Sequence, residues 1–126
     1  MSKALLKNYR QSPRKVRLVA DMVRGMPVEE ALQRLEFTPK RAAREMAKVI
    51  RSAQANARQH GVAGDNMTVA EVRVDEGPTL FRIRPRAQGR AFRIRKRTSH
   101  IFVNLKDAHE SVSEAQTGSG AASSSK

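Results

Sequence analysis

Apolar and polar positions change their spacing about halfway along this 126-residue chain. Between residues 12 and 61, apolar side chains recur every three or four residues, which is typical of amphipathic helices. From about residue 70 to residue 105 they alternate with polar side chains, which indicates half-buried strands. Residues 2–10 are short and weakly patterned, and we interpret them as an edge strand. The pattern therefore predicts one edge strand, a helical region and then a group of strands.

Proline and glycine divide the helical region into three predicted helices. Ser12-Pro13 is typical of a helix start, and Gly25 is typical of a helix end. A short second helix is expected to begin at Pro27. Thr38-Pro39 repeats the starting signal, and the third helix should then run without a breaker to Gly61, over about 22 residues.

The predicted third helix carries a basic stripe beside its small apolar face. The stripe consists of Arg41, Arg44, Lys48, Arg51 and Arg58. It is either an ordinary solvated face or a secondary contact for a partner, and the sequence leaves both interpretations open.

Residues 81–95 alternate arginine with apolar residues on both sides of a turn at residues 85–89, which predicts a long hairpin. Pairing residues whose numbers sum to 175 matches apolar residues across the hairpin and across the strands that precede and follow it. The expected partners are Ala70 and Leu105, Val72 and Val103, Val74 and Ile101, Phe81 and Ile94, and Ile83 and Phe92.

This register has two expected consequences for the hairpin. Arg82 lies opposite Arg93, a destabilising like-charge pair, and the apolar face of the hairpin lies on the opposite side from the core face. Because an isolated two-stranded ribbon is marginal in any case, we expect the free hairpin to be mobile and to become ordered when phosphates neutralise it. Its arms should project roughly 25 to 30 Å from the body.

Charge makes the hairpin the main functional candidate. The chain has 25 Lys and Arg against 12 Asp and Glu, a net charge of +13, and residues 82–97 alone carry eight cations without a carboxylate. Seven of the eight are arginine, which forks onto phosphates and stacks on bases, so RNA is the favoured partner. The alternatives are a disordered basic loop and an edge strand whose arginines prevent aggregation.

Composition excludes several other classes of protein. The absence of cysteine excludes disulfide scaffolds, cysteine nucleophiles and the usual structural zinc sites. No apolar run is long enough to span a membrane, and no secretory signal is present, so we expect no membrane partner. His60, His100 and His109 are scattered, and no phosphate-binding loop occurs. We therefore predict no enzyme activity, no metal and no cofactor. Residues 111–126 are rich in Ser, Gly and Ala and are expected to form a disordered tail.

Four segments together resemble one known family. They are SPRKVRLVADMVRG at residues 12–25, VDEGPTL at 74–80, and RPRAQGRA followed by RIRKRTSHI across 84–101. Over residues 4 to about 106, the chain resembles the L twenty-two family of bacterial large-subunit ribosomal proteins. The resemblance implies an α+β fold with three helices packed on a small antiparallel sheet. We therefore expect residues 1–110 to form a single RNA-binding domain, which includes the predicted hairpin at about residues 78–99.

The resemblance also implies a function in the bacterial ribosome, and hence in the cytoplasm. The protein would bind large-subunit (23S) rRNA, support subunit assembly and place its hairpin tip in the wall of the nascent-peptide exit tunnel, near the constriction where macrolides act. Its partners would be this rRNA, neighbouring large-subunit proteins and the nascent peptide. The alternative is a free-standing nucleic-acid-binding protein or RNA chaperone.

The family motifs imply which residues of this chain contact rRNA. These are Arg14, Lys15, Arg17, Arg82, Arg84, Arg86, Arg90, Arg93, Arg95, Lys96, Arg97, Thr98, Ser99 and His100. The tunnel-facing tip would consist of Arg86, Ala87, Gln88, Gly89 and Arg90. Phe81 and Phe92 depart from the basic or polar residues expected in many relatives, so we expect them to pack or stack rather than to contact phosphates.

Overall fold

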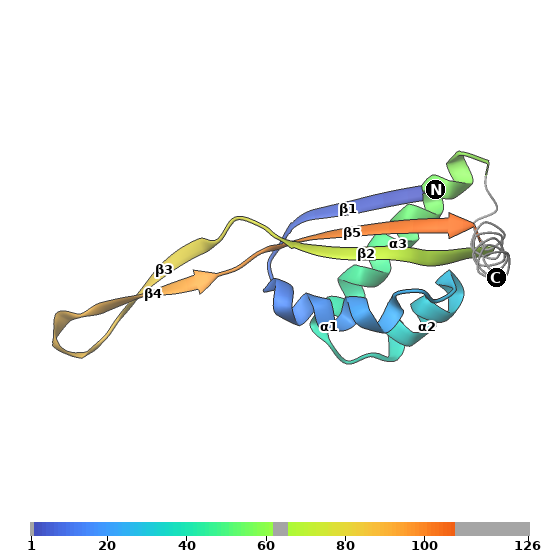
Figure 1. Ribbon diagram of the computed structural model, residues 1–126. Coiled ribbons are helices and arrows are strands. Elements are labelled where there is room, and N and C mark those ends of the chain that lie inside the picture. Colours follow the sequence, from blue (N-terminus) through green and yellow to red (C-terminus); the bar gives the residue numbers. More distant parts are fainter. Residues whose placement is uncertain (1, 62–65, 108–126) are drawn as a thin grey trace, which may run out of the picture.

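Three helices lie on one face of a three-stranded antiparallel sheet, and a two-stranded ribbon extends away from this body (Figure 1). The computed structural model describes residues 2–61 and 66–107. The elements in chain order are β1 (Ser2–Tyr9), α1 (Pro13–Val23), α2 (Val28–Phe37), α3 (Arg41–Gln59), β2 (Met67–Glu76), β3 (Leu80–Pro85), the 3₁₀ turn η2 (Ala87–Gly89), β4 (Ala91–Lys96) and β5 (Ser99–Asp107). The strand order is β1-β5-β2 in the body and β3-β4 in the ribbon. The α+β class is confirmed, whereas the tail expected at residues 111–126 lies outside the described residues.

The core lies between the helices and the inner face of the sheet, where the predicted apolar positions meet. On β5, alternate residues Ile101, Val103 and Leu105 are fully buried. The buried face of α3 is rich in alanine, and these small side chains let the helix lie close to the sheet. The helical and strand periodicities of the sequence therefore bury one continuous apolar cluster.

The third helix begins later than its sequence signal indicates. Thr38 ends α2 instead of starting α3, because its Oγ1 donates a hydrogen bond of 2.7 Å to the carbonyl oxygen of Arg34, one turn back. Lys40 is the N-cap residue of α3, which spans 19 residues from Arg41. The prediction of a helix of about 22 residues from Thr38-Pro39 was therefore wrong at its start.

The predicted register of the body strands is correct except at one bulge. Val72 pairs with Val103, and Val74 pairs with Ile101, as expected. The register shifts between Val69 and Glu71, so Leu105 pairs with Val69 instead of with Ala70. The extra residue at this bulge allows both Val69 and Val72 to face the core, where both are buried.

The predicted register of the hairpin was wrong by one residue. Ile94 pairs with Arg82 instead of with Phe81, and Ile83 pairs with Arg93. Between the last pair of the body, Glu76 with Ser99, and the first pair of the ribbon, one arm contains residues 77–79 and the other contains only residues 97–98. The additional residue on the outgoing arm acts like a bulge and moves every later pair by one position.

Candidate nucleic-acid interface

A tight crossing of the chain at Gly77 and Thr98 connects the ribbon to the body. The Gly77 N–H donates to the Thr98 carbonyl oxygen at 2.9 Å, and Thr98 Oγ1 donates to the Pro78 carbonyl oxygen at 2.6 Å. A Cβ atom on Gly77 would lie only 2.5 Å from Thr98 Oγ1, so glycine allows the two arms to approach closely at this point.

The last three residues in the predicted rRNA-binding set lie at this crossing, facing protein. Thr98 and Ser99 are 2% and 0% exposed, and Ser99 Oγ donates to the Gln11 carbonyl oxygen at 2.6 Å. His100 is half-buried, and its Nδ1 accepts a hydrogen bond from the Asn8 N–H at 3.2 Å. Their contacts in the described chain therefore hold the ribbon in its orientation.

Every direct cross-strand pair of the ribbon, except Pro85 with Ala91, joins a cation to an apolar residue. One face carries Arg82, Arg84 and Lys96, and the other face carries Arg93 and Arg95. Residues that face each other across an antiparallel pair share one face of the sheet, so neither face is purely apolar. The expected Arg82–Arg93 repulsion and the expected apolar face of the hairpin were therefore both wrong, because the one-residue shift places each cation opposite an apolar residue.

Two arginines of the ribbon lie over aromatic rings. The Arg93 guanidinium carbon is 5.7 Å from the centre of the Phe81 ring, and that of Arg86 is 5.3 Å from the centre of the Phe92 ring. Both rings are about half exposed, at 51% and 55%. Such contacts pre-position a guanidinium while leaving its N–H groups free to bind phosphate.

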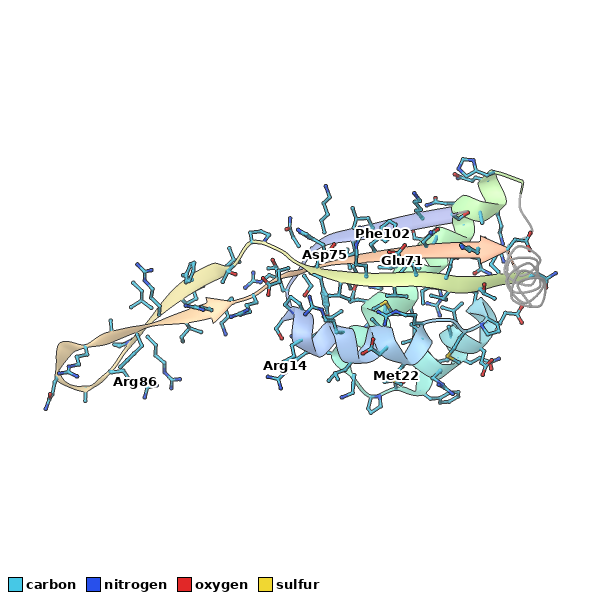
Figure 2. The ribbon with its side chains drawn as sticks, in the orientation of Figure 1. Arg14, Met22, Glu71, Asp75, Arg86 and Phe102 are labelled. Carbon is cyan, nitrogen blue, oxygen red and sulfur yellow. The ribbon has the colours of Figure 1, made fainter. Side chains whose placement is uncertain are left out.

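The distal loop of the ribbon is closed by one short backbone contact. The Arg86 N–H donates to the Arg90 carbonyl oxygen at 2.6 Å, and Gln88 and Gly89 both adopt positive φ angles, of 63° and 71°. All residues of the predicted tip are exposed, and Figure 2 shows Arg86 on the distal part of the ribbon. The tip thus presents side chains on a compact turn.

A basic hollow of about 750 Å³ lies at the base of the ribbon. It is lined by Arg10, Gln11, Ser12, Lys15, Arg41, Arg95, Lys96 and Arg97, a set with six cations and no carboxylate. Ser12 is the N-cap of α1 and Arg41 is the first residue of α3, so the positive ends of two helix dipoles add to this charge. The hollow is suited to bind the phosphate backbone of a nucleic acid.

The hollow includes two basic residues that the sequence analysis did not assign to the rRNA-binding set. Arg10 follows β1, whereas Arg41 begins α3, and only the fold brings them to the arginines of β4. Arg41 belongs to the basic stripe of α3, which was the available signal. Arg97 also lies 3.7 Å from Glu76, a loose and exposed ion pair.

The three predicted basic residues of α1 have different surroundings. Lys15 lines the hollow, and Arg14 is exposed and points away from the body (Figure 2). Arg17 instead donates from Nε and Nη2 to the carbonyl oxygen of Val74 on β2, at 3.3 and 3.1 Å. The structure therefore brings Lys15 together with residues of the hairpin, whereas Arg17 binds the backbone of β2 at the edge of the sheet.

Two findings in residues 2–61 and 66–107 bear on other kinds of site. No group of three or more His, Asp or Glu side chains in these ranges could hold a metal ion. No helix there is long and apolar enough to cross a membrane.

Comparison with known proteins identifies similar chains. The sequence model of the family described as "Ribosomal protein L22p/L17e" matches residues 4–106. The chain is 59% identical over 107 residues to "Large ribosomal subunit protein uL22" of Maridesulfovibrio salexigens, which covers 84% of this chain and 97% of that protein. It is 58% identical over 97 residues to the protein of the same name from Caldicellulosiruptor saccharolyticus, covering 76% and 80% of the two chains.

Proposed function

The chain belongs to the L22p/L17e family of ribosomal proteins, and we propose that it is a structural constituent of the large ribosomal subunit that binds large-subunit rRNA and supports its assembly. Its relatives are ribosomal proteins and not enzymes. In this proposal the ribbon and the basic hollow bind the RNA, neighbouring subunit proteins contact the body, and the protein works in the bacterial cytoplasm.

The observation that carries this proposal is the distribution of cations on the ribbon. Arg82 and Arg84 lie on one face, and Arg93 and Arg95 lie on the other, with nearly every side chain exposed. A ribbon that lay flat on a nucleic acid would need cations on one face only. Cations on both faces are suited to a ribbon with phosphates on both sides, as in the interior of a folded RNA.

We further propose that the tip of the ribbon reaches the wall of the nascent-peptide exit tunnel. The compact turn at Arg86–Arg90 lies at the end of the ribbon away from the body, and its side chains are exposed (Figure 1). If the hollow binds RNA where the ribbon leaves the body, the tip is the part of the chain that extends farthest into the subunit. Its contacts would then be with the nascent peptide.

Sedimentation tests the proposed location. After sucrose-gradient centrifugation of a cell extract at moderate magnesium, the protein should migrate with large-subunit particles. Recovery in light fractions would contradict the proposal and favour the alternative, a free-standing RNA-binding protein or RNA chaperone.

A unique cysteine tests the placement of the tip. The chain has no cysteine, so Gln88→Cys introduces a single attachment point for a photo-crosslinker. Stalled ribosomes should then give a crosslink between position 88 and the nascent peptide, whereas the matched variant Glu29→Cys, on the exposed side of α2, should give none. Crosslinks from position 29 alone would reverse the proposed orientation.

A further inference from the structure

Phe37 is an exposed aromatic residue that the hairpin does not explain. It is the last residue of α2, and 83% of its surface is exposed, more than for any other large apolar residue in the described chain. A ring in this position gives up the stabilisation that burial would provide. One exposed apolar residue alone carries little meaning, so its surroundings decide the argument.

A basic groove runs between α2 and α3 next to this ring. It has a volume of about 430 Å³ and is lined by Leu32, Leu35, Glu36, Thr38, Lys40, Arg44, Ala47, Lys48 and Arg51. Its four cations outnumber the single carboxylate of Glu36. Lys48 Nζ lies 3.4 Å from an oxygen of Glu45, whereas Lys40, Arg44 and Arg51 make no ion pair within the described residues.

The ring of Phe37 does not line the groove itself but a neighbouring hollow. This second hollow, of about 480 Å³, is lined by Glu30, Gln33, Arg34, Phe37 and Thr38. Because Thr38 lines both hollows, the two adjoin. From the N-cap residue Lys40 onward, the four cations recur every three or four residues along α3 and extend over about 16 Å, which is long enough to follow more than one phosphate.

We propose that this groove binds a single-stranded segment of RNA, with its phosphates along Lys40, Arg44 and Arg51 and an unpaired base stacked on Phe37. Arginine and lysine in a groove bind the backbone, and an exposed aromatic ring offers a platform to any base. Glu30 and Glu36 lie on the α2 side and direct the phosphates towards α3. The inference rests on the proposed RNA-binding function but concerns a site separate from the ribbon and the basic hollow.

Fluorescence offers a direct test, because the chain contains no tryptophan. In the full chain carrying Phe37→Trp, the only indole lies at the proposed stacking site. Adding a short oligouridylate RNA at low salt should quench its emission. An oligomer of the same length without bases should still bind but should not quench, because it offers phosphates without a stacking partner.

Variants of the groove separate stacking from general attraction. In the Phe37→Trp background, Arg44→Gln with Arg51→Gln should shift the quenching titration by about tenfold, whereas Lys3→Gln with Lys7→Gln on β1 should leave it unchanged. Without the tryptophan, Phe37→Ala should weaken oligouridylate binding at this site by about tenfold, measured against Phe37→Tyr. Phe102→Trp, on the outer face of the sheet beside Arg73, serves as a control indole that should not be quenched (Figure 2).

The outcomes distinguish this inference from the proposed function. Binding of labelled RNA, followed by anisotropy, without quenching at position 37 would overturn the groove while leaving RNA binding by the ribbon intact. No binding of labelled RNA would overturn both. Quenching by polyglutamate as strong as that by RNA would show that the groove takes an acidic peptide instead.

Discussion

The guanidinium of Arg17 on α1 caps the backbone carbonyl of Val74 on β2, with hydrogen bonds of 3.3 and 3.1 Å. Arg24, two turns later, donates from Nη2 to the carbonyl oxygen of Val72 at 2.8 Å. Since β2 is an edge strand, both arginines block backbone groups that another strand could otherwise pair with. The basic signature of the first helix thus serves the fold as well as the proposed interface.

Arg17→Gln is expected to destabilise the protein by about 1 kcal/mol, because the carbonyl of Val74 loses a charged donor. For a domain of this size, that corresponds to a fall in Tm of about 4 °C. Arg14→Gln is the matched control, since Arg14 is exposed and should leave Tm unchanged while weakening RNA binding. Equal losses of stability in the two variants would contradict the capping role.

Gly77→Ala should disturb the crossing at the base of the ribbon. The new methyl group would lie 2.5 Å from Thr98 Oγ1 and displace the hydroxyl that donates to the Pro78 carbonyl, at a cost of about 1 to 2 kcal/mol. In a double-mutant cycle measured by thermal unfolding, Thr98→Ala should remove most of the cost of Gly77→Ala. Simple additivity of the two losses would show that the clash is not with Thr98.

Tyr9→Phe should leave the stability unchanged or raise it by up to about 1 kcal/mol. The Tyr9 hydroxyl is buried without a hydrogen-bond partner among the described residues, so its removal loses no bond. Tyr9→Ala, which also removes the buried ring, should lower Tm. A lower Tm for Tyr9→Phe would reveal a partner for the hydroxyl.

Tyr9 should also make the stability of the protein depend on pH. Burial raises the pKa of Tyr9 above its ordinary value of 10.0. The folded state holds the proton of the Tyr9 hydroxyl more tightly than the unfolded state does. The stability that the folded state gains from this difference is therefore fully present below pH about 10 and is lost as the pH rises further. The difference in Tm between the natural chain and Tyr9→Phe should therefore stay constant up to about pH 9 and grow in favour of phenylalanine as the pH rises above about 10. A constant difference would contradict the raised pKa.

Neutralising either face of the ribbon should weaken RNA binding to a similar degree. Arg82→Gln with Arg84→Gln changes one face, and Arg93→Gln with Arg95→Gln changes the other. If each cation meets a phosphate, each pair should reduce the slope of log K against log salt by about 1.5. A full effect from one pair and none from the other would mean that the ribbon lies on RNA instead of being enclosed by it.

Local pattern was sufficient to predict the elements of the body. The spacing of apolar residues changes from helical to alternating between α3 and β2, and Gly25 ends the α1 region with a positive φ of 82°, which glycine adopts without strain. The prediction of Thr38 as a cap was wrong because a threonine hydroxyl can bond backwards to end one helix as readily as it can start the next.

The ribbon shows what periodicity does not determine. The alternation of arginine and apolar residues is compatible with two registers, in which the numbers of paired residues sum to 175 or to 176. The first register is favoured only if apolar residues are assumed to pair with each other. No core lies beneath the ribbon to require this, and the extra residue in the outgoing arm decides the register. The basic hollow was missed because Arg10, Arg41 and Arg95 come from three separate parts of the chain that only the tertiary fold brings together.

The most direct test of whether large-subunit RNA encloses the ribbon is to cleave that RNA with hydroxyl radicals generated at the tip of the ribbon. Large subunits assembled with Gln88→Cys, carrying an iron chelate that generates hydroxyl radicals, should show strand breaks in 23S rRNA around the tip. The same reagent on Glu29→Cys should give a different and weaker pattern, because that residue lies on the body. We predict strong, localised cleavage from position 88. Subunits that contain the labelled protein but show no rRNA cleavage from position 88 would contradict the account.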